Sequence, residues 1–197
     1  MRYAQIRNMD ISNGEGIGVA LFVQGCHFHC KDCFNQETWD FNGGKEWTNE
    51  TEDEFVELIK RPYIKRVSIL GGEPLADENL DGVLHLVQRI KNEFYNTTIY
   101  SDTECENHNI LNENLQQIRV LFKNTKIIWL YSGYTFEQCL ADKKRNTILK
   151  HIDVMIDGRF KNDKKDLSLK FRGSSNQRVI DVQKSLETRG IVSLYTD

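Results

Sequence analysis

Three cysteines within eight residues constrain this chain more than any other feature of its sequence. Cys26, Cys30 and Cys33 are separated by three and two residues, and they follow the apolar run 19–23, which is typical of a buried strand. Thiolates are soft ligands that select zinc or the iron of iron–sulfur clusters. Because the two remaining cysteines lie more than seventy residues further along, a four-iron cluster bound here would keep one iron free of protein ligands. That open iron is where chemistry can take place.

Cysteine spacing alone leaves a second interpretation open. Structural zinc sites commonly combine three cysteines with one histidine in tetrahedral geometry, and His27 and His29 both lie inside the cysteine loop. If neither histidine binds metal, we expect both to face solvent. Cys105 and Cys139 are expected to be ordinary thiols.

A Gly-Gly-Glu-Pro sequence at 71–74 follows the apolar segment 67–70, which is typical of another strand. Two consecutive glycines permit backbone torsions that other residues resist, and they let a ligand approach the main chain. The proline then removes a backbone donor and fixes the exit of the chain. The segment predicts a turn whose backbone lines a binding site.

Composition limits the class of protein. The chain has 197 residues, 39% of them hydrophobic, and a formal net charge of −3, so we expect one soluble domain without a nucleic-acid partner. No apolar run approaches the roughly 20 residues of a membrane helix, and the start of the chain does not resemble a signal peptide. Five cysteines, an odd number, fit a reducing compartment. These features predict a cytoplasmic protein with no membrane partner.

The order of apolar patterns predicts a parallel sheet. Strand patterns alternate with helix patterns, which implies right-handed crossovers. Ligand sites in such folds gather at the carboxyl ends of strands, where the cysteine loop, the 71–74 turn, and the segments 132–135 and 157–160 are expected. The expected strands are 19–23, 67–70, 97–100, 127–131 and 154–156, and the expected helices are 48–60, 81–94, 111–122 and 136–150.

The cysteine spacing and the 71–74 turn together resemble the signature of radical S-adenosylmethionine (SAM) enzymes. Most of the chain is similar to one family among them, the activating proteins of anaerobic ribonucleoside-triphosphate reductase. The similarity covers 1–99 and resumes at about 126–180. It is carried by Asp10-Ile11, Asn13-Gly14, Phe22-Val23, Gly25-Cys26, Asn35, Thr38-Trp39, Gly71-Gly72-Glu73-Pro74-Leu75, Ser132-Gly133-Tyr134, Asp157-Gly158-Arg159-Phe160 and Arg172-Gly173-Ser174-Ser175-Asn176-Gln177.

The resemblance implies the fold and its divisions. It implies an α/β fold, a partial (β/α) barrel of the radical SAM type with a mostly parallel sheet, in a single domain at 1–197. Residues at about 100–125 look like an insertion that is atypical of the family, and about 161–197 form a C-terminal tail.

The resemblance also implies two cofactors. One [4Fe-4S] cluster per chain is bound by three cysteines, and SAM chelates the fourth iron. Asp32 departs from the wider group, in which this position is often aromatic. Its side chain therefore cannot stack on adenine, but its backbone can still line the pocket beside Phe34. No catalytic residue is expected beyond the cluster and SAM. The expected iron ligands are Cys26, Cys30 and Cys33, and the expected SAM contacts are Asp32, Cys33, Phe34, Gly71, Gly72 and Glu73.

The implied activity is reductive cleavage of SAM followed by hydrogen abstraction, which generates a glycyl radical on the large subunit of the reductase. The implied partners are that subunit and a one-electron donor such as flavodoxin or ferredoxin. Three polar residues of the tail are expected to contact the large subunit: Arg172, Asn176 and Arg178.

Two other functional classes stay open. One is another small radical SAM enzyme, either a pyruvate formate-lyase-type activator or a deazapurine synthase. The block 172–177 argues against the former, and the pattern around Trp39 argues against the latter. The other class is a zinc-bound module without catalytic activity.

Overall fold

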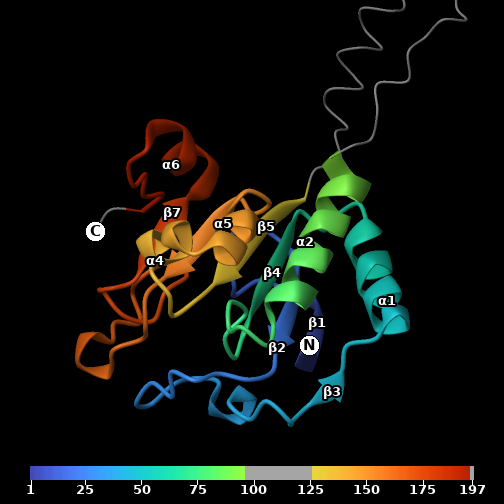
Figure 1. Cartoon of the computed structure of the whole chain (residues 1–197), viewed down its shortest axis with the longest axis horizontal. Helices are drawn as coiled ribbons and strands as arrows, with labels where there is room; N and C mark the ends of the chain where they lie inside the picture. Colours follow the sequence, from blue (N-terminus) through green and yellow to red (C-terminus); the bar gives the residue numbers. More distant parts are fainter. Residues whose placement is uncertain (96–125, 196–197) are drawn as a thin grey trace, which may run out of the picture.

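The computed structural model describes residues 1–95 and 126–195, and in this part of the chain seven strands form one sheet in the order β3-β1-β2-β4-β5-β6-β7 (Figure 1). The strands are β1 (Arg2–Asp10), β2 (Gly18–Val23), β3 (Lys45–Glu46), β4 (Arg66–Gly71), β5 (Ile127–Tyr131), β6 (Val154–Asp157) and β7 (Arg178–Asp181). The helices are α1 (Asn49–Lys60), α2 (Leu80–Tyr95), α4 (Phe136–Ala141), α5 (Lys143–Leu149) and α6 (Val182–Thr188), with short 3-10 helices at Gln36–Thr38 and Asn162–Lys164. None of the helices described here is long and apolar enough to cross a membrane.

The centre of the sheet is parallel, as the alternating pattern predicted. Strands β2, β4, β5 and β6 pair in parallel, whereas β1, β3 and β7 pair antiparallel at the two sides. The two strands at the ends of the sheet, β3 and β7, do not pair with each other. The sheet is therefore open, and the predicted partial barrel is not confirmed.

The two ends of the sheet contain elements that the sequence analysis did not foresee. Strand β1 precedes the first expected strand, and the segment assigned to the tail contains β7 and α6. The helix expected at 136–150 is two helices, because Asp142 has extended backbone torsions and its carboxylate accepts a hydrogen bond from the Arg145 N–H as the N-cap of α5. The strand expected at 97–100, the helix expected at 111–122, Cys105 and the insertion at 100–125 lie outside the described residues.

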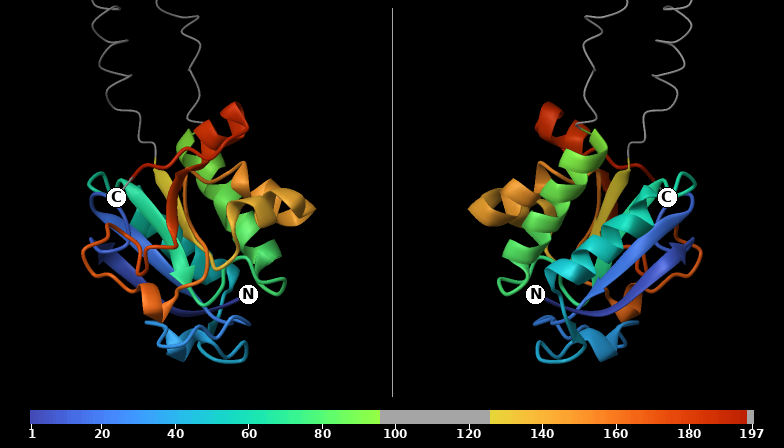
Figure 2. Two further views of the ribbon diagram at one scale, coloured as in Figure 1. Left: turned by 90° about the vertical axis from the view of Figure 1, so that its left-hand side faces the viewer. Right: turned by 90° about the vertical axis from the view of Figure 1, so that its right-hand side faces the viewer.

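Alternate residues of each strand face opposite sides of the sheet. One set packs against the helices in a closed apolar core, and it includes Leu21, Ile69, Leu130, Met155 and Ile180. The other set faces a side on which irregular segments lie, and it includes Phe22, Leu70, Tyr131, Ile156 and Val179. Figure 2 shows this division, with α2, α4 and α5 on one side of the strands and the loop between β6 and β7 on the other. We call the first side the helical face and the second the open face.

A buried arginine holds the loop between β1 and β2 at one end of the open face. Arg66 is 1% exposed and pairs with the carboxylate of Asp10 at 2.8 Å. Its guanidinium also donates to the backbone carbonyls of Asn13 at 2.6 Å and Glu15 at 3.2 Å. A buried arginine requires such a complete set of acceptors. The side-chain amide of Asn13 in turn donates to the carboxylate of Asp10 at 2.8 Å, which holds that carboxylate in place.

Candidate metal and cofactor site

The three cysteines of the loop after β2 line one small cavity of about 120 Å³. The cavity lies where four parallel strands end, because the segments that follow β4, β5 and β6 complete its wall. The segments expected at this edge from the sequence are therefore brought together. The residues they contribute are Gly71, Gly72, Glu73, Ser132, Gly133, Gly158, Arg159 and Phe160.

The chain turns from β2 into the cysteine loop at Gly25. This residue has a φ of +97°, and a Cβ there would lie 2.1 Å from the ring of Phe41, so only glycine fits. Its N–H donates to the Thr38 carbonyl at 2.8 Å, and the Cys26 N–H donates to the Trp39 carbonyl at 3.0 Å. The loop is thus fixed to the 3-10 helix that follows it.

The surroundings of the sulfur atoms suit a soft metal group. The Asn35 N–H donates to the sulfur of Cys33 at 3.4 Å, the kind of outer contact that orients and tunes a metal ligand. Burial raises the pKa of the Cys26 thiol and the pKa of the Cys30 thiol, so deprotonation is expected to accompany metal binding.

The cysteines do not form a preassembled set of ligands. Within the described residues, no group of three or more histidine, cysteine, aspartate or glutamate side chains is placed to hold a metal ion. The two histidines of the loop have other neighbours, since the ring of His27 forms a hydrogen bond with the carboxylate of Glu78 at 2.9 Å and His29 stacks on Trp39 at 4.5 Å between ring centroids. A group with three thiolate ligands therefore fits the donor set better than zinc with a histidine.

The Gly-Gly-Glu turn after β4 packs directly against the start of the cysteine loop. Gly71 has a φ of +107°, and the Gly72 N–H donates to the Val23 carbonyl at 2.9 Å. A Cβ on Gly72 would lie 2.4 Å from the carbonyl oxygen of Gly25. At Gly72 the neighbouring turn therefore fills the space that a side chain would take, and the expected approach of a ligand to these two glycines stays a prediction.

Glu73 is buried, and both oxygens of its carboxylate bind groups of the protein. One oxygen accepts from the Leu75 N–H at 2.8 Å and from the Ser132 hydroxyl at 2.7 Å, and the other accepts from the Gly133 N–H at 2.7 Å. Burial raises the pKa of Glu73 to about 7, against the lowering effect of these donors. The residue thereby ties the end of β4 to the turn after β5, and its expected contact with SAM stays a prediction.

Phe28 connects that turn to the cysteine loop. A Cβ on Gly133 would lie 2.3 Å from the ring of Phe28, which packs edge-on against Tyr134 at 4.9 Å. The guanidinium of Arg159 lies over the same ring at 4.2 Å. The sequence analysis did not select Phe28, although an aromatic residue between the first two cysteines was the available signal.

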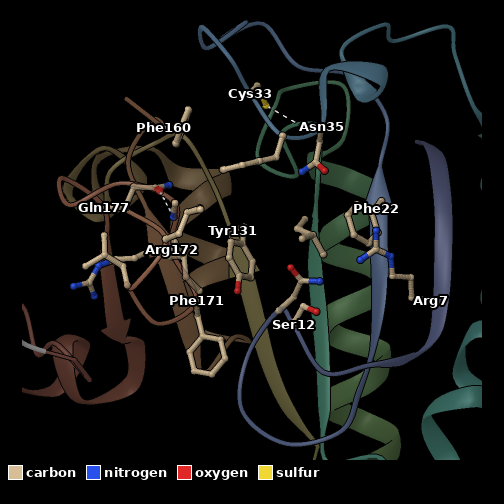
Figure 3. A pocket seen from close by; sticks show the side chains of 17 residues that line it. Arg7, Ser12, Phe22, Cys33, Asn35, Tyr131, Phe160, Phe171, Arg172 and Gln177 are labelled. Carbon is tan, nitrogen blue, oxygen red and sulfur yellow. Dashed lines mark hydrogen bonds between the residues drawn. The ribbon is translucent and has the colours of Figure 1, made fainter. Parts of the chain in front are cut away.

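A larger cavity of about 540 Å³ extends from the cysteine loop over the open face (Figure 3). Tyr131 projects into it from the end of β5, and its hydroxyl oxygen is buried without a hydrogen-bond partner among the described residues. Such a hydroxyl is expected to bind a ligand or water. Tyr131 was not foreseen as a site residue. The two cavities share Cys33, Asn35, Leu70, Tyr131, Phe160 and Gln177.

Two residues of the cysteine loop that are expected to contact SAM differ in their position relative to the two cavities. Asp32 is exposed, has a φ of +59°, and is not among the described residues that line either cavity. Phe34 is 56% exposed and lines the larger cavity, where its ring packs against Phe160 at 5.2 Å. The geometry thus places Phe34, but not Asp32, next to the space for a ligand.

The three tail residues expected to contact a partner have different surroundings. Arg172 is buried and lines the larger cavity. The side-chain amide of Asn176 donates to the Arg159 carbonyl at 2.9 Å. Arg178 binds the carboxylates of Asp157 at 3.0 Å and Glu137 at 2.8 Å. Arg178 therefore has a structural role at the edge of the sheet, and the partner contacts of all three stay predictions.

Comparison with known proteins agrees with an iron–sulfur site. The family model of a 4Fe-4S single cluster domain matches residues 12–122 and 103–180. Together these matches span all three cysteines of the loop, the Gly-Gly-Glu-Pro turn and the block 172–177. An iron–sulfur cluster, rather than zinc, is thus the group that this family binds.

Curated relatives match nearly the whole chain. A protein of Vibrio cholerae is 37% identical over 179 residues, which cover 90% of this chain and 96% of the relative. One from Escherichia coli strain K12 is 35% identical over 91% of this chain and 97% of its own length, and one from Enterobacteria phage T4 is 32% identical over 91% and 93%. Each is named anaerobic ribonucleoside-triphosphate reductase-activating protein. The chain therefore belongs to the family of anaerobic ribonucleoside-triphosphate reductase-activating proteins.

Proposed function

We propose that this chain activates an anaerobic ribonucleoside-triphosphate reductase as a radical SAM enzyme. In this proposal Cys26, Cys30 and Cys33 bind a [4Fe-4S] cluster, and SAM binds beside it in the joined cavities. The open sheet then corresponds to the wall of a partial barrel. When bound, the cluster supplies one electron for cleavage of SAM into methionine and a 5′-deoxyadenosyl radical, which takes a hydrogen atom from a glycine of the large subunit and becomes 5′-deoxyadenosine.

One observation carries the proposal. The three cysteines and the Gly-Gly-Glu turn line the same cavity, and this cavity shares six wall residues with a larger one that reaches over the open face. A site for one small group thus adjoins a space for a second, larger molecule. That arrangement suits a cluster with an open iron and a ligand that must reach both the iron and a protein substrate.

The residues of this chain position and enclose the reactants. The Asn35 N–H orients the sulfur of Cys33, and Glu73 holds the turn that supports Phe28. Tyr131 offers its hydroxyl to a ligand in the larger cavity. The protein supplies binding and orientation, while the cofactors carry the difficult step. The electron comes from a one-electron donor such as flavodoxin or ferredoxin.

Anaerobic reconstitution with iron and sulfide tests the proposal. We expect a brown protein that absorbs broadly near 400 nm and that, with dithionite and SAM, releases methionine and 5′-deoxyadenosine in equal amounts. After addition of the large subunit, we expect electron paramagnetic resonance (EPR) to show a glycyl radical on that subunit. A reconstituted cluster without SAM cleavage would contradict the radical SAM mechanism. Cleavage without a radical on the reductase would point to another substrate.

A further inference from the structure

The loop between β6 and β7 has a charge opposite to that of the whole chain. We call residues 158–177 the strap, because they lie along the open face. The strap has six basic and two acidic residues, a net charge of +4, although the whole chain has a formal net charge of −3. Four of its basic side chains are exposed lysines: Lys161, Lys164, Lys165 and Lys170.

The strap also exposes large apolar side chains at the mouth of the larger cavity. Leu167 is 81% exposed, and Phe34 of the cysteine loop is 56% exposed beside the strap. Both side chains line the larger cavity. Lys165 lies over the ring of Phe34, with its ammonium nitrogen 5.1 Å from the ring centroid. Exposed apolar side chains thus lie beside a positively charged one at this cavity. An exposed apolar patch with a polar rim is typical of a surface that contacts another protein.

The strap is held in one conformation by its own hydrogen bonds. The Asp166 N–H donates to the Gly173 carbonyl at 3.2 Å, and the Ser175 N–H donates to the Lys164 carbonyl at 2.9 Å. At the tip, the carboxylate of Asp166 accepts from the N–H and the hydroxyl of Ser168 at 2.8 and 2.6 Å. These bonds fix the turn that presents Leu167 to solvent. A surface organised before binding loses little entropy when a partner docks.

We propose that the strap is the docking surface for the large reductase subunit, and that it recognises an acidic and apolar segment next to the radical-bearing glycine. This inference rests on the proposed function, because the glycine of the partner must then reach the larger cavity through the opening that the strap borders. The exposed leucine and phenylalanine favour a protein over a nucleotide as the occupant. The positive charge of the strap favours a negatively charged partner segment, which it would attract over several ångströms.

Charge reversal on the strap tests the electrostatic part. Lys161→Glu combined with Lys164→Glu is expected to weaken binding to the large subunit by about tenfold at low salt, with a smaller difference at high salt because ions screen exposed charges. Lys143→Glu combined with Lys150→Glu is the matched control, since both lysines are exposed and lie at the two ends of α5, a helix on the helical side of the sheet (Figure 2). The affinity of each pair is measured at 50 and 300 mM salt, settings chosen so that the Debye length shortens between them.

The pattern across the two pairs decides the electrostatic claim. Weakened binding in the strap pair alone supports the docking surface. Equal weakening in both pairs would show that only the net charge of the chain matters and would overturn the proposal. Unchanged binding in both pairs would also overturn it. The isolated chain is also tested for ATP binding. If the parent chain and the control pair bind ATP and the strap pair does not, the lysines belong to a nucleotide site and the proposal is overturned.

The apolar tip has its own test. Leu167→Ser should weaken binding to the large subunit at both salt concentrations, because a lost apolar contact is not screened. Leu140→Ser is the control, since Leu140 is 38% exposed and belongs to α4, a helix on the helical side of the sheet (Figure 2). Circular dichroism melting checks that both variants fold. Equal affinity of the Leu167 variant and the parent chain would show that the tip stays outside the interface and would overturn the proposal.

These measurements stay separate from the test of the proposed function. Release of 5′-deoxyadenosine with dithionite does not need the large subunit, so the strap pair should match the parent chain in this assay. If the parent chain itself releases none, the radical SAM proposal fails while the binding comparison can still be read. If the strap pair cleaves SAM normally but produces less glycyl radical, docking is the step that has changed.

Discussion

The two faces of the sheet are made from the same strands, yet they differ in almost every physical respect. On the helical face, Leu21, Leu130 and Met155 are fully buried in one continuous apolar core. On the open face, the residues that follow these three in the sequence border a cavity of about 540 Å³ that also contains buried polar groups. Each strand thus supplies stability with one set of side chains and a binding site with the other.

The difference shows how a small chain can keep a large cavity. The helical face holds the larger apolar core, whereas the open face combines two small apolar clusters with a hydroxyl, that of Tyr131, which has no hydrogen-bond partner among the described residues. Substitutions on the two faces should accordingly separate effects on stability from effects on activity.

Cysteines of the candidate site and of the helical core give the largest contrast. Alanine at Cys26, Cys30 or Cys33 should abolish both iron retention and SAM cleavage, because two thiolates cannot hold the cluster. Cys139 is fully buried in the helical core, where burial raises the pKa of its thiol to about 12. Cys139→Ala should keep its iron and lose about 1 kcal/mol of unfolding free energy. Iron per chain after anaerobic reconstitution is the measurement, and equal iron loss in all four variants would contradict the assignment.

Neighbouring residues of β5 give the next contrast. Leu130→Ala should lower the free energy of unfolding by about 3 kcal/mol, because it opens a cavity in the helical core. Tyr131→Phe removes a buried hydroxyl that has no partner in the described part of the chain, so stability should stay within about 1 kcal/mol of the parent. The same change should weaken SAM binding. Urea unfolding measures both stabilities, and a larger loss at Tyr131 than at Leu130 would refute the distinction between the faces.

Local sequence signals were enough to predict which segments meet at the candidate site. Residues 19–23, 67–70, 127–131 and 154–156 all show strand patterns, and the corresponding strands β2, β4, β5 and β6 are parallel. The segments that follow these strands therefore meet at one edge of the sheet, as expected. The cysteine spacing alone left zinc and an iron–sulfur cluster open, and the resemblance carried by the cysteines and the glycines together predicted the cluster. These features depend on short stretches of chain, which a sequence displays directly.

Features that depend on distant contacts could not be read from the sequence. Strand β1 mixes exposed and half-buried residues, so it has no clear apolar alternation. Nothing local indicates that the carboxylate of Glu73 turns toward Ser132 and Gly133, or that Gly25 fills the space beside Gly72. Closure of the sheet is likewise a property of its two outer strands, β3 and β7, which do not pair with each other.

Buried glutamates on the two sides of the molecule give a smaller contrast. Glu73→Gln replaces one carboxylate oxygen by an amide N–H₂, which cannot accept hydrogen bonds from the surrounding donors. We therefore expect this variant to lose about 2 kcal/mol of unfolding free energy. Glu52 is also buried, and it accepts from the Trp47 indole at 3.0 Å and Arg89 at 3.1 Å, so Glu52→Gln should cost a similar amount.

Activity should distinguish the two glutamine variants. Only Glu73→Gln should slow SAM cleavage, by at least about tenfold, since a small displacement of positioned groups is costly in catalysis. Its cluster should also give an altered EPR spectrum, because Glu73 holds the turn that contacts Phe28. Equal cleavage rates and identical spectra in the two variants would show that Glu73 has a purely structural role.

The smallest effect is expected where the helical face meets the end of the strap. Glu137 of α4 accepts from Arg178, which lowers the pKa of this glutamate from 4.5 to about 2. Because the folded pKa lies below the unfolded one, the ion pair stabilises the fold fully above pH 4.5, and this contribution is lost as the pH falls toward 2. The side chain of Glu137 is 57% exposed, so solvent screening should limit the contribution to about 1 kcal/mol or less.

Glu137→Gln should therefore lower the melting temperature at pH 7 but not near pH 2. Glu57→Gln is the matched control on α1, since Glu57 pairs with Lys60 on the surface at side-chain exposures of 68% and 46%. A melting temperature that falls equally at both pH values would show that the glutamate contributes packing rather than charge.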